Sequence, residues 1–191
     1  MPRPREFDEG TAVAGALRAF RTAGYEATST QELCEATGLG RSSVYNAFGS
    51  KHALFRRALQ RYFEDTMRHY RALFDEQRSA RETFRAVFAG VVEDEAQPGA
   101  CGCFAVNTAS ELGGRDPVIT EDLRRHGEQL VALYTEVVRR GQRDGEIDPD
   151  ADPKAVAEYV HAVVGGLRVL ARNGFDRTAM ENVVERALTA L

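Results

Sequence analysis

The stretch TSTQELCEATGLGRSSVYNAFGSK, residues 28–51, decides the fold of this 191-residue chain. It reads as two short helices separated by a glycine-bounded turn. Ser29 and Glu32 have the spacing of a capping box, in which each side chain bonds the other residue's backbone amide at a helix start. Gly38 suits the left-handed conformation that ends a helix. The stretch therefore predicts a helix, a tight turn and a second helix that begins at Arg41.

The second short helix has an apolar back and a polar front. Val44 and Phe48 are four residues apart and so lie on the same side of a helix, where they can pack against the rest of the fold. The side chains left outside are those of Arg41, Ser42, Ser43, Tyr45 and Asn46. Such a front suits a DNA groove, because arginine and asparagine read base edges and hydroxyls bind phosphates. The pattern predicts a helix-turn-helix.

This segment resembles the DNA-binding domain of the TetR family of bacterial transcriptional regulators. Inside it, the matching features are TSTQEL at residues 28–33, Gly38-Leu39, Val44-Tyr45, Phe48 and Gly49-Ser50-Lys51. Around it, they are Ala16-Leu17, Phe20, Gly24-Tyr25 and Ala53-Leu54-Phe55. The match covers roughly residues 7–60. Gly40 departs from the family, which more often has a hydroxyl residue there, but glycine is tolerated as a helix N-cap.

Nine polar residues of this segment are candidate DNA-binding residues. Tyr45 has a phenol of the right length for a phosphate oxygen, and Lys51 places a cation beside a helix N-terminus, which favours phosphate. The resemblance implies phosphate contacts at these same two positions. Further phosphate contacts are expected from Thr28, Thr30 and Gln31. Base edges are expected to be read by Arg41, Ser42, Ser43 and Asn46. The alternative is that Tyr45 packs between helices and the polar residues form a solvated face.

Helical periodicity is nearly continuous in the rest of the chain, and strand signals are nearly absent. Helices are expected at about residues 6–23, 51–74, 84–97, 103–112, 117–141, 153–173 and 176–188. The predicted fold is all-α with about nine helices. We expect a three-helix DNA-binding head at residues 1–52 and a helical body for effector binding and dimerisation at residues 53–191. The long helix that begins at Lys51 would connect them rigidly.

The charge and composition of the chain fit this division. The net charge is −4, but residues 1–74 have a surplus of three basic side chains and residues 75–191 a surplus of seven acidic ones. A basic head on an acidic body is typical of a DNA reader. No apolar run is long enough for a membrane span, and the charged start MPRPREFDEG is unlike a secretion signal. Three cysteines without a regular framework indicate a reducing compartment, so a cytoplasmic location is expected.

The two C-terminal helices are unusually apolar for an exposed tail, and Gly165-Gly166 permits close approach of another helix. The resemblance implies a homodimer built on a four-helix bundle from these helices. Such a dimer would place two heads on the half-sites of a pseudo-palindromic operator. The predicted interface residues are Val160, Val164, Gly165, Leu167, Val184 and Leu188. The alternative is that the same apolar stripes bury against the chain's own body.

Cys101-Gly102-Cys103 is a poor zinc motif because no second pair accompanies it. The four histidines, which lack ligand spacing, are His52, His69, His126 and His161. Neither a metal nor a cofactor is predicted. Cys103 stands early in a helix, where the dipole and free amides can make a thiol reactive. The Gly-Cys pair at this point also resembles the one in TetR-type regulators that sense electrophiles or oxidants. The alternative is a small buried apolar residue.

The resemblance also implies an effector pocket among the middle helices, which couples an unknown small molecule to separation of the two heads. The candidate pocket residues are Phe88, Cys103, Phe104, Asn107, Glu111, Tyr134 and Tyr159. Aromatic residues at helical spacing can equally be plain core.

The sequence therefore predicts a homodimeric repressor that a small-molecule or redox signal releases from its operator. A TetR-like activator, a thiol-based redox sensor and a relative that has lost its operator remain alternatives. A Cys-dependent enzyme, with Cys103 acting beside His126 or His161, is a remote one, because no catalytic motif surrounds these residues. No catalytic residue and no membrane partner are predicted.

Overall fold

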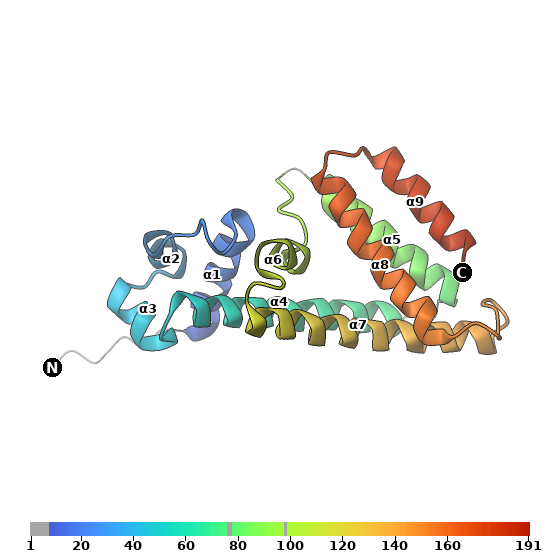
Figure 1. The fold of residues 1–191 in the computed structure, drawn as a ribbon, viewed down its shortest axis with the longest axis horizontal. Helices are drawn as coiled ribbons and strands as arrows, with labels where there is room; N and C mark the ends of the chain where they lie inside the picture. Colours follow the sequence, from blue (N-terminus) through green and yellow to red (C-terminus); the bar gives the residue numbers. More distant parts are fainter. Residues whose placement is uncertain (1–7, 76–77, 98) are drawn as a thin grey trace.

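The computed structural model describes residues 8–75, 78–97 and 99–191, and in these ranges the chain forms nine α-helices and no strand (Figure 1). Their bounds are α1 Glu9–Ala23, α2 Thr30–Thr37, α3 Arg41–Phe48, α4 Lys51–Asp75, α5 Ala80–Ala96, α6 Phe104–Leu112, α7 Pro117–Arg143, α8 Pro153–Arg172 and α9 Arg177–Thr189. The predicted all-α class is confirmed. Of the helix expected over residues 6–23, residues 6 and 7 lie outside the described ranges.

The helices form an elongated molecule with a head at one end and a body at the other (Figure 1). The head consists of α1, α2 and α3 around the first part of α4. Toward the far end of α4, helices α5, α8 and α9 pack on one another, and α5 and α8 also pack on α7. Helix α6 lies between the two groups. Helices α4 and α7 run in the same direction, since Arg56 pairs with Asp122 near their starts and Arg140 bonds the Phe74 carbonyl near their ends. None of the helices described could span a membrane.

Local signals set the helix-turn-helix as predicted. Ser29 Oγ accepts a hydrogen bond from the Glu32 amide at 3.2 Å, and the Glu32 carboxylate accepts one from the Ser29 amide at 2.6 Å. Gly38 ends α2 in the left-handed conformation, with φ 69°. Gly40 precedes α3 and provides no side-chain cap. At the crossing of α1 and α2, a Cβ on Gly15 would lie 2.0 Å from a backbone oxygen of α2, so this contact requires glycine.

The head does not have a core of its own. Its buried cluster combines residues of α1 to α4 with Phe104 and Leu112 of α6 and Ile119 of α7. Phe55 of α4 lies at the centre of this cluster, with its ring 5.0 Å from that of Phe20 and 5.5 Å from that of Phe104. Because α4 also reaches the body core, a boundary at residues 52 and 53 stays a prediction.

The body core corrects the predicted dimer interface. Helices α4, α5, α7, α8 and α9 enclose a second buried cluster. Four of the predicted interface residues belong to it and are at most 7% exposed, namely Val160, Leu167, Val184 and Leu188. Val164 also packs partly against this cluster. These residues bury against the chain's own body, which was the alternative interpretation of the apolar stripes.

A buried histidine joins α4 to α7. His126 is 5% exposed, and its ring stacks on Phe63 with centroids 4.0 Å apart and planes at 13°. Its Nδ1 has no hydrogen-bond partner among the described residues. Burial, aided by the nearby His161, lowers the pKa of His126 to about 4, and burial also lowers the pKa of His161. Both rings are therefore neutral at pH 7.

This burial predicts a loss of stability in mild acid. An unfolded imidazole has a pKa near 6.5, so below that pH the unfolded chain binds a proton that the folded chain does not. The free energy of unfolding should fall by about 2 kcal/mol between pH 7.5 and pH 5 through His126 alone. In His126→Phe, which can keep the stack on Phe63, urea unfolding should show a smaller fall. The exposed control His69→Phe should behave like the natural chain, and an equal fall in both variants would contradict the assignment.

Candidate DNA-binding surface and head–body junction

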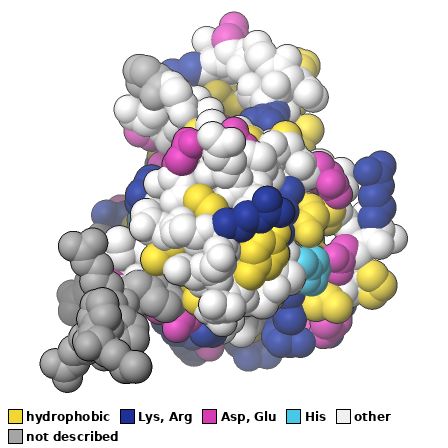
Figure 2. Space-filling view, turned by 90° about the vertical axis from the view of Figure 1, so that its left-hand side faces the viewer, with side chains coloured by type: hydrophobic (Ala, Val, Ile, Leu, Met, Phe, Trp, Pro, Cys, Tyr) yellow, Lys and Arg dark blue, Asp and Glu magenta, His cyan; other side chains and the backbone are white. Residues whose placement is uncertain are grey.

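The front of α3 is a polar surface on a fixed apolar back. Val44 and Phe48 are buried at 2% and 9% exposure, as predicted. The predicted base-reading residues are all exposed, and they are Arg41, Ser42, Ser43 and Asn46. Figure 2 looks onto the head end of the molecule, where a basic side chain lies across an apolar one near the centre of the face. The α3 sequence, RSSVYNAF, holds one cation and no acid.

Tyr45 connects the two helices of the motif. Its side chain is 38% exposed, its hydroxyl lies 3.4 Å from Thr30 Oγ1 on α2, and the Arg41 guanidinium carbon lies 6.0 Å from its ring centroid. The phenol is thus held between α2 and α3 while its ring remains on the surface. Gln31, also exposed, donates to Glu35 at 3.1 Å along α2.

Thr28 does not belong to this surface. It is 1% exposed, and its hydroxyl donates to the Gly24 carbonyl at 2.5 Å. A buried hydroxyl that already donates a hydrogen bond cannot reach a phosphate. The prediction that Thr28 contacts DNA was therefore wrong. The sequence showed only a hydroxyl residue ahead of the capping box, which is why its role was misjudged.

Lys51 begins α4 and lies against the turn between α1 and α2. Its Nζ donates to the Glu26 carbonyl at 3.2 Å and sits 4.7 Å from the centroid of the Tyr25 ring. Ser50 caps the same helix start, since its Oγ accepts from the Ala53 amide at 3.0 Å. The ammonium and the first free amides of α4 therefore face the same end of the molecule, which is an arrangement that attracts phosphate.

Glu111, which was predicted to line a pocket, instead holds the head. Its carboxylate accepts hydrogen bonds from the backbone amides of Tyr25 at 2.9 Å and Glu26 at 2.7 Å. Gly24 precedes them at φ 84°, and a Cβ there would lie 2.9 Å from the same carboxylate. Helix α6 is thus attached to the same turn that Lys51 contacts. Nothing in the sequence pattern indicates this link, because Tyr25 and Glu26 lie 86 and 85 residues away from Glu111 in the chain.

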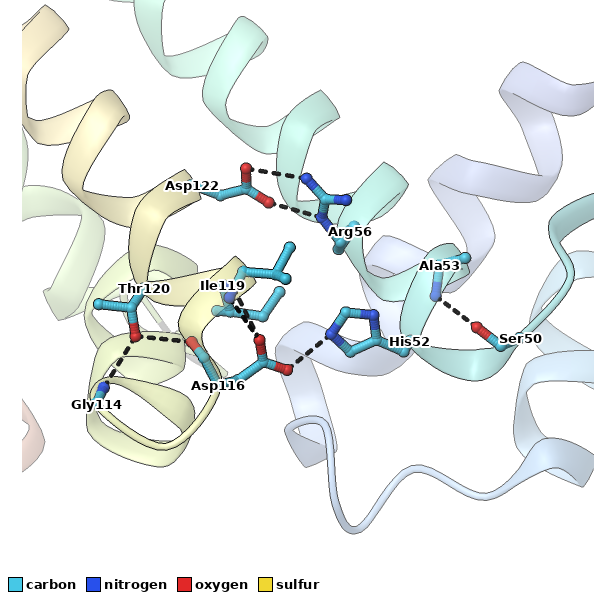
Figure 3. Close-up of polar contacts among 10 residues, drawn as sticks. Ser50, His52, Ala53, Arg56, Gly114, Asp116, Ile119, Thr120 and Asp122 are labelled. Atoms are coloured by element: carbon cyan, nitrogen blue, oxygen red, sulfur yellow. Dashed lines mark hydrogen bonds and ion pairs between the residues drawn. The ribbon is translucent and has the colours of Figure 1, made fainter.

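A histidine–aspartate hydrogen bond and an ion pair join the starts of α4 and α7 (Figure 3). His52 Nε2 lies 2.7 Å from Asp116 Oδ2, and Arg56 makes a two-bond contact with Asp122 at 2.8 and 3.1 Å. Asp116 also caps α7, and its bonds from the Ile119 amide and from His52 hold the pKa of its carboxyl below the usual value. Sequence reasoning predicted a helix start at Asp116-Pro117 but did not identify either pair.

The predicted effector-pocket residues do not surround one cavity. Phe88 and Tyr134 are fully buried in the body core, Phe104 belongs to the head cluster, and Tyr159 is 40% exposed on α8. Asn107 donates to the Cys101 carbonyl at 2.8 Å. The prediction that these residues line one pocket was wrong. Aromatic residues of a core and of a pocket follow the same helical period, so the sequence does not distinguish them.

Cys103 precedes α6 as its N-cap residue and is half-buried. Its Sγ lies 3.3 Å from the Tyr62 hydroxyl, and burial and the neighbouring thiol raise the pKa of that phenol. Among the residues described, no group of three or more His, Cys, Asp or Glu side chains is arranged to hold a metal ion.

The geometry of α2 and α3 defines a helix-turn-helix DNA-binding protein. Residues 12–58 match the family described as bacterial regulatory proteins, tetR family, and residues 79–187 match the tetracyclin repressor-like C-terminal domain. The chain belongs to the TetR family. It is therefore a DNA-binding transcriptional regulator and not an enzyme.

Relatives and solved structures agree with this assignment. The chain is 32% identical to the HTH-type transcriptional repressor ComR of Escherichia coli (strain K12), over 99% of this chain and 90% of that protein. It is 28% identical over the full length of both chains to YezE of Bacillus subtilis (strain 168), an uncharacterized HTH-type regulator. A cysteine mutant of the TetR family regulator CifR, complexed with a 26-bp operator DNA, is 34% identical with a TM-score of 0.86, covering 98% of this chain and 99% of CifR.

The exposed front of α3 and the start of α4 should contribute differently to DNA binding. Arg41→Ala should cost about 1–3 kcal/mol on a preferred sequence and relax base preference, because an arginine aimed at a groove reads base edges. Lys51→Ala should weaken binding to all sequences alike and reduce its salt dependence. Fluorescence anisotropy on matched and mismatched duplexes measures both. Equal losses on both duplexes for Arg41→Ala would contradict this division, and thermal unfolding controls for loosening of the α1–α2 turn.

Proposed function

We propose that the protein is a homodimeric repressor that binds a pseudo-palindromic operator in the cytoplasm. The observation that carries the proposal is the exposed polar front of α3, fixed from behind by Val44 and Phe48. ComR, and DhaR of Mycobacterium sp. (strain GP1), are named as repressors, and CifR was solved on operator DNA, which supports the same role here. One recognition helix reads only a few base pairs, so two heads on adjacent half-sites are needed.

The outer face of α8 is the surface we propose for the dimer. Tyr159, Ala162, Gly166 and Val169 lie on one side of the helix and are all exposed. A Cβ added at Gly165 or Gly166 would meet nothing within 4 Å of its own chain. This uncharged stripe is opposite the buried stripe of Val160 and Leu167, so α8 is apolar on two sides. Burying the second side requires another molecule.

We further propose that modification of the Cys103 thiol by an electrophile or oxidant weakens DNA binding. The thiol stands at the start of α6, and Glu111 at the other end of the same helix holds the α1–α2 turn. A group added to Sγ, which contacts the Tyr62 hydroxyl, would displace the start of α6. Because α6 is a single short helix, such a shift would reach the turn on which Lys51 rests.

A mobility-shift assay on DNA that flanks the protein's own gene tests the proposed function. The natural chain should give a discrete, salt-sensitive complex, and N-ethylmaleimide should release it. Cys103→Ser should resist release, whereas Cys101→Ser should still be released. If both variants respond alike, Cys103 is not the sensor, and if no complex forms the operator assignment fails. A reporter gene then distinguishes repression from activation.

The dimer surface can be tested by adding one charge. Ala162→Glu should convert the dimer into a monomer of 21.1 kDa in sedimentation equilibrium, because an unpaired carboxylate at the centre of the stripe is costly to bury. The matched control is Ala89→Glu, which adds the same charge at an exposed position of α5. A natural chain that is monomeric at micromolar concentration would contradict the dimer itself. A dimeric Ala162→Glu protein would place the interface elsewhere.

A further inference from the structure

A cleft of about 870 Å³ opens between α4 and α7, beside the end of α3. Its size falls within the range of small-molecule sites. Phe48 comes from α3, Phe63, Met67 and Arg71 come from α4, and His126 comes from α7. None of the residues predicted as an effector pocket lines it, and neither does Cys103. It is thus separate from the thiol considered above.

One wall of the cleft is apolar and aromatic. Phe63 and His126 stack face to face, and Met67 follows Phe63 by one helical turn. His126 is 95% buried, and its Nδ1 lacks a partner among the described residues. Because that nitrogen is enclosed, the His126 ring contributes packing to the cleft wall and no hydrogen bond.

The charges around the cleft favour an anion. Its lining contains five arginines but only two acids, Glu64 and Asp122. Four of the arginines already pair with carboxylates, and these are Arg56, Arg57, Arg68 and Arg125. Arg71 pairs with no carboxylate whose side chain the structure describes. Glu64 accepts a bond from Gln60, so among the described contacts neither acid of the lining pairs with Arg71.

We propose that this cleft binds a small organic anion with a planar aromatic part. The aromatic part would lie along the Phe63–His126 wall, and the anionic group, a carboxylate or sulfonate, would pair with Arg71. Positions 63, 67 and 71 recur every four residues and so share one face of α4. Arg71 lies about 12 Å along the helix axis from Phe63, which a long arginine side chain and a two-ring ligand can span.

Occupancy of the cleft would bear on DNA binding, and this consequence rests on the proposed function. Phe48 is the last residue of the recognition helix, whereas His126 belongs to the body. The bidentate Arg56–Asp122 pair, which joins α4 to α7, also lines the cleft. A ligand that touches both walls would bind more tightly at one angle between head and body than at another. It would change the affinity for DNA by no more than that difference in its own affinity.

Two fluorescent probes test the site without DNA. Anilinonaphthalene sulfonate carries an aryl ring system and an anion, and N-phenylnaphthylamine is its uncharged counterpart. The sulfonate should bind the natural dimer saturably and more tightly than the amine. Arg71→Gln should weaken the sulfonate by roughly threefold or more and leave the amine unchanged. The matched control Arg85→Gln removes an exposed arginine that lies outside the cleft and should leave both probes unchanged.

Equal affinity of the two probes, or sulfonate binding that Arg71→Gln does not alter, would overturn the proposal. Because Arg71 is exposed and forms no described ion pair, the variant should fold, and thermal unfolding verifies this. Phe63→Leu provides a second variant, which should weaken both probes by removing the aromatic wall. Operator binding is then measured with and without the sulfonate. Loss of DNA binding in every sample would count against the proposed function alone, because probe binding needs no operator.

Discussion

The packing of Phe55 is the constraint on which the rest of the structure depends. Its ring contacts Phe20 and Tyr25 of the head and Phe104 of α6 in one buried cluster. Residues of α6 and α7 complete the core of the head. Head and body are therefore parts of one packed unit. A change in the body cannot leave the head unaffected, since close-packed interiors transmit small displacements.

Polar links on two sides complete this attachment. Glu111 bonds two backbone amides of the α1–α2 turn, whereas Arg56 and His52 pair with the first residues of α7. The Glu111 bond to the Tyr25 amide is partly buried, whereas its bond to the Glu26 amide is exposed, and both are charge-assisted bonds with a defined direction. The Arg56–Asp122 pair is exposed, so water screens it and it contributes less to stability, whereas the His52–Asp116 bond is partly buried.

The sequence predicts what short-range chemistry decides. The capping box at Ser29, the left-handed Gly38 and the buried pair Val44 and Phe48 all depend on neighbours within a few residues. Glu111 was misassigned because its partners lie far away in the chain, and no local pattern marks them. The stripe through Val160 and Leu167 was rightly expected to be buried. Periodicity does not show which surface covers an apolar face. The stripe was predicted to pack against a second protomer, whereas it packs against the chain's own body.

The two sides of α8 are what would allow the proposed dimer to form on one short body. Helix α8 gives one side to its own core and keeps Ala162 and Gly166 outside, so a dimer can form without removing residues from the fold. In the proposed dimer, each head would be attached to its own body and, through α8, to the second protomer. The recognition helix would then need no change of shape to lose the operator. A small change in the angle between head and body alters the distance between two heads, and the half-sites on DNA do not adjust. The contacts with α6 and α7 that stabilise the head would therefore also transmit a movement of the body to it.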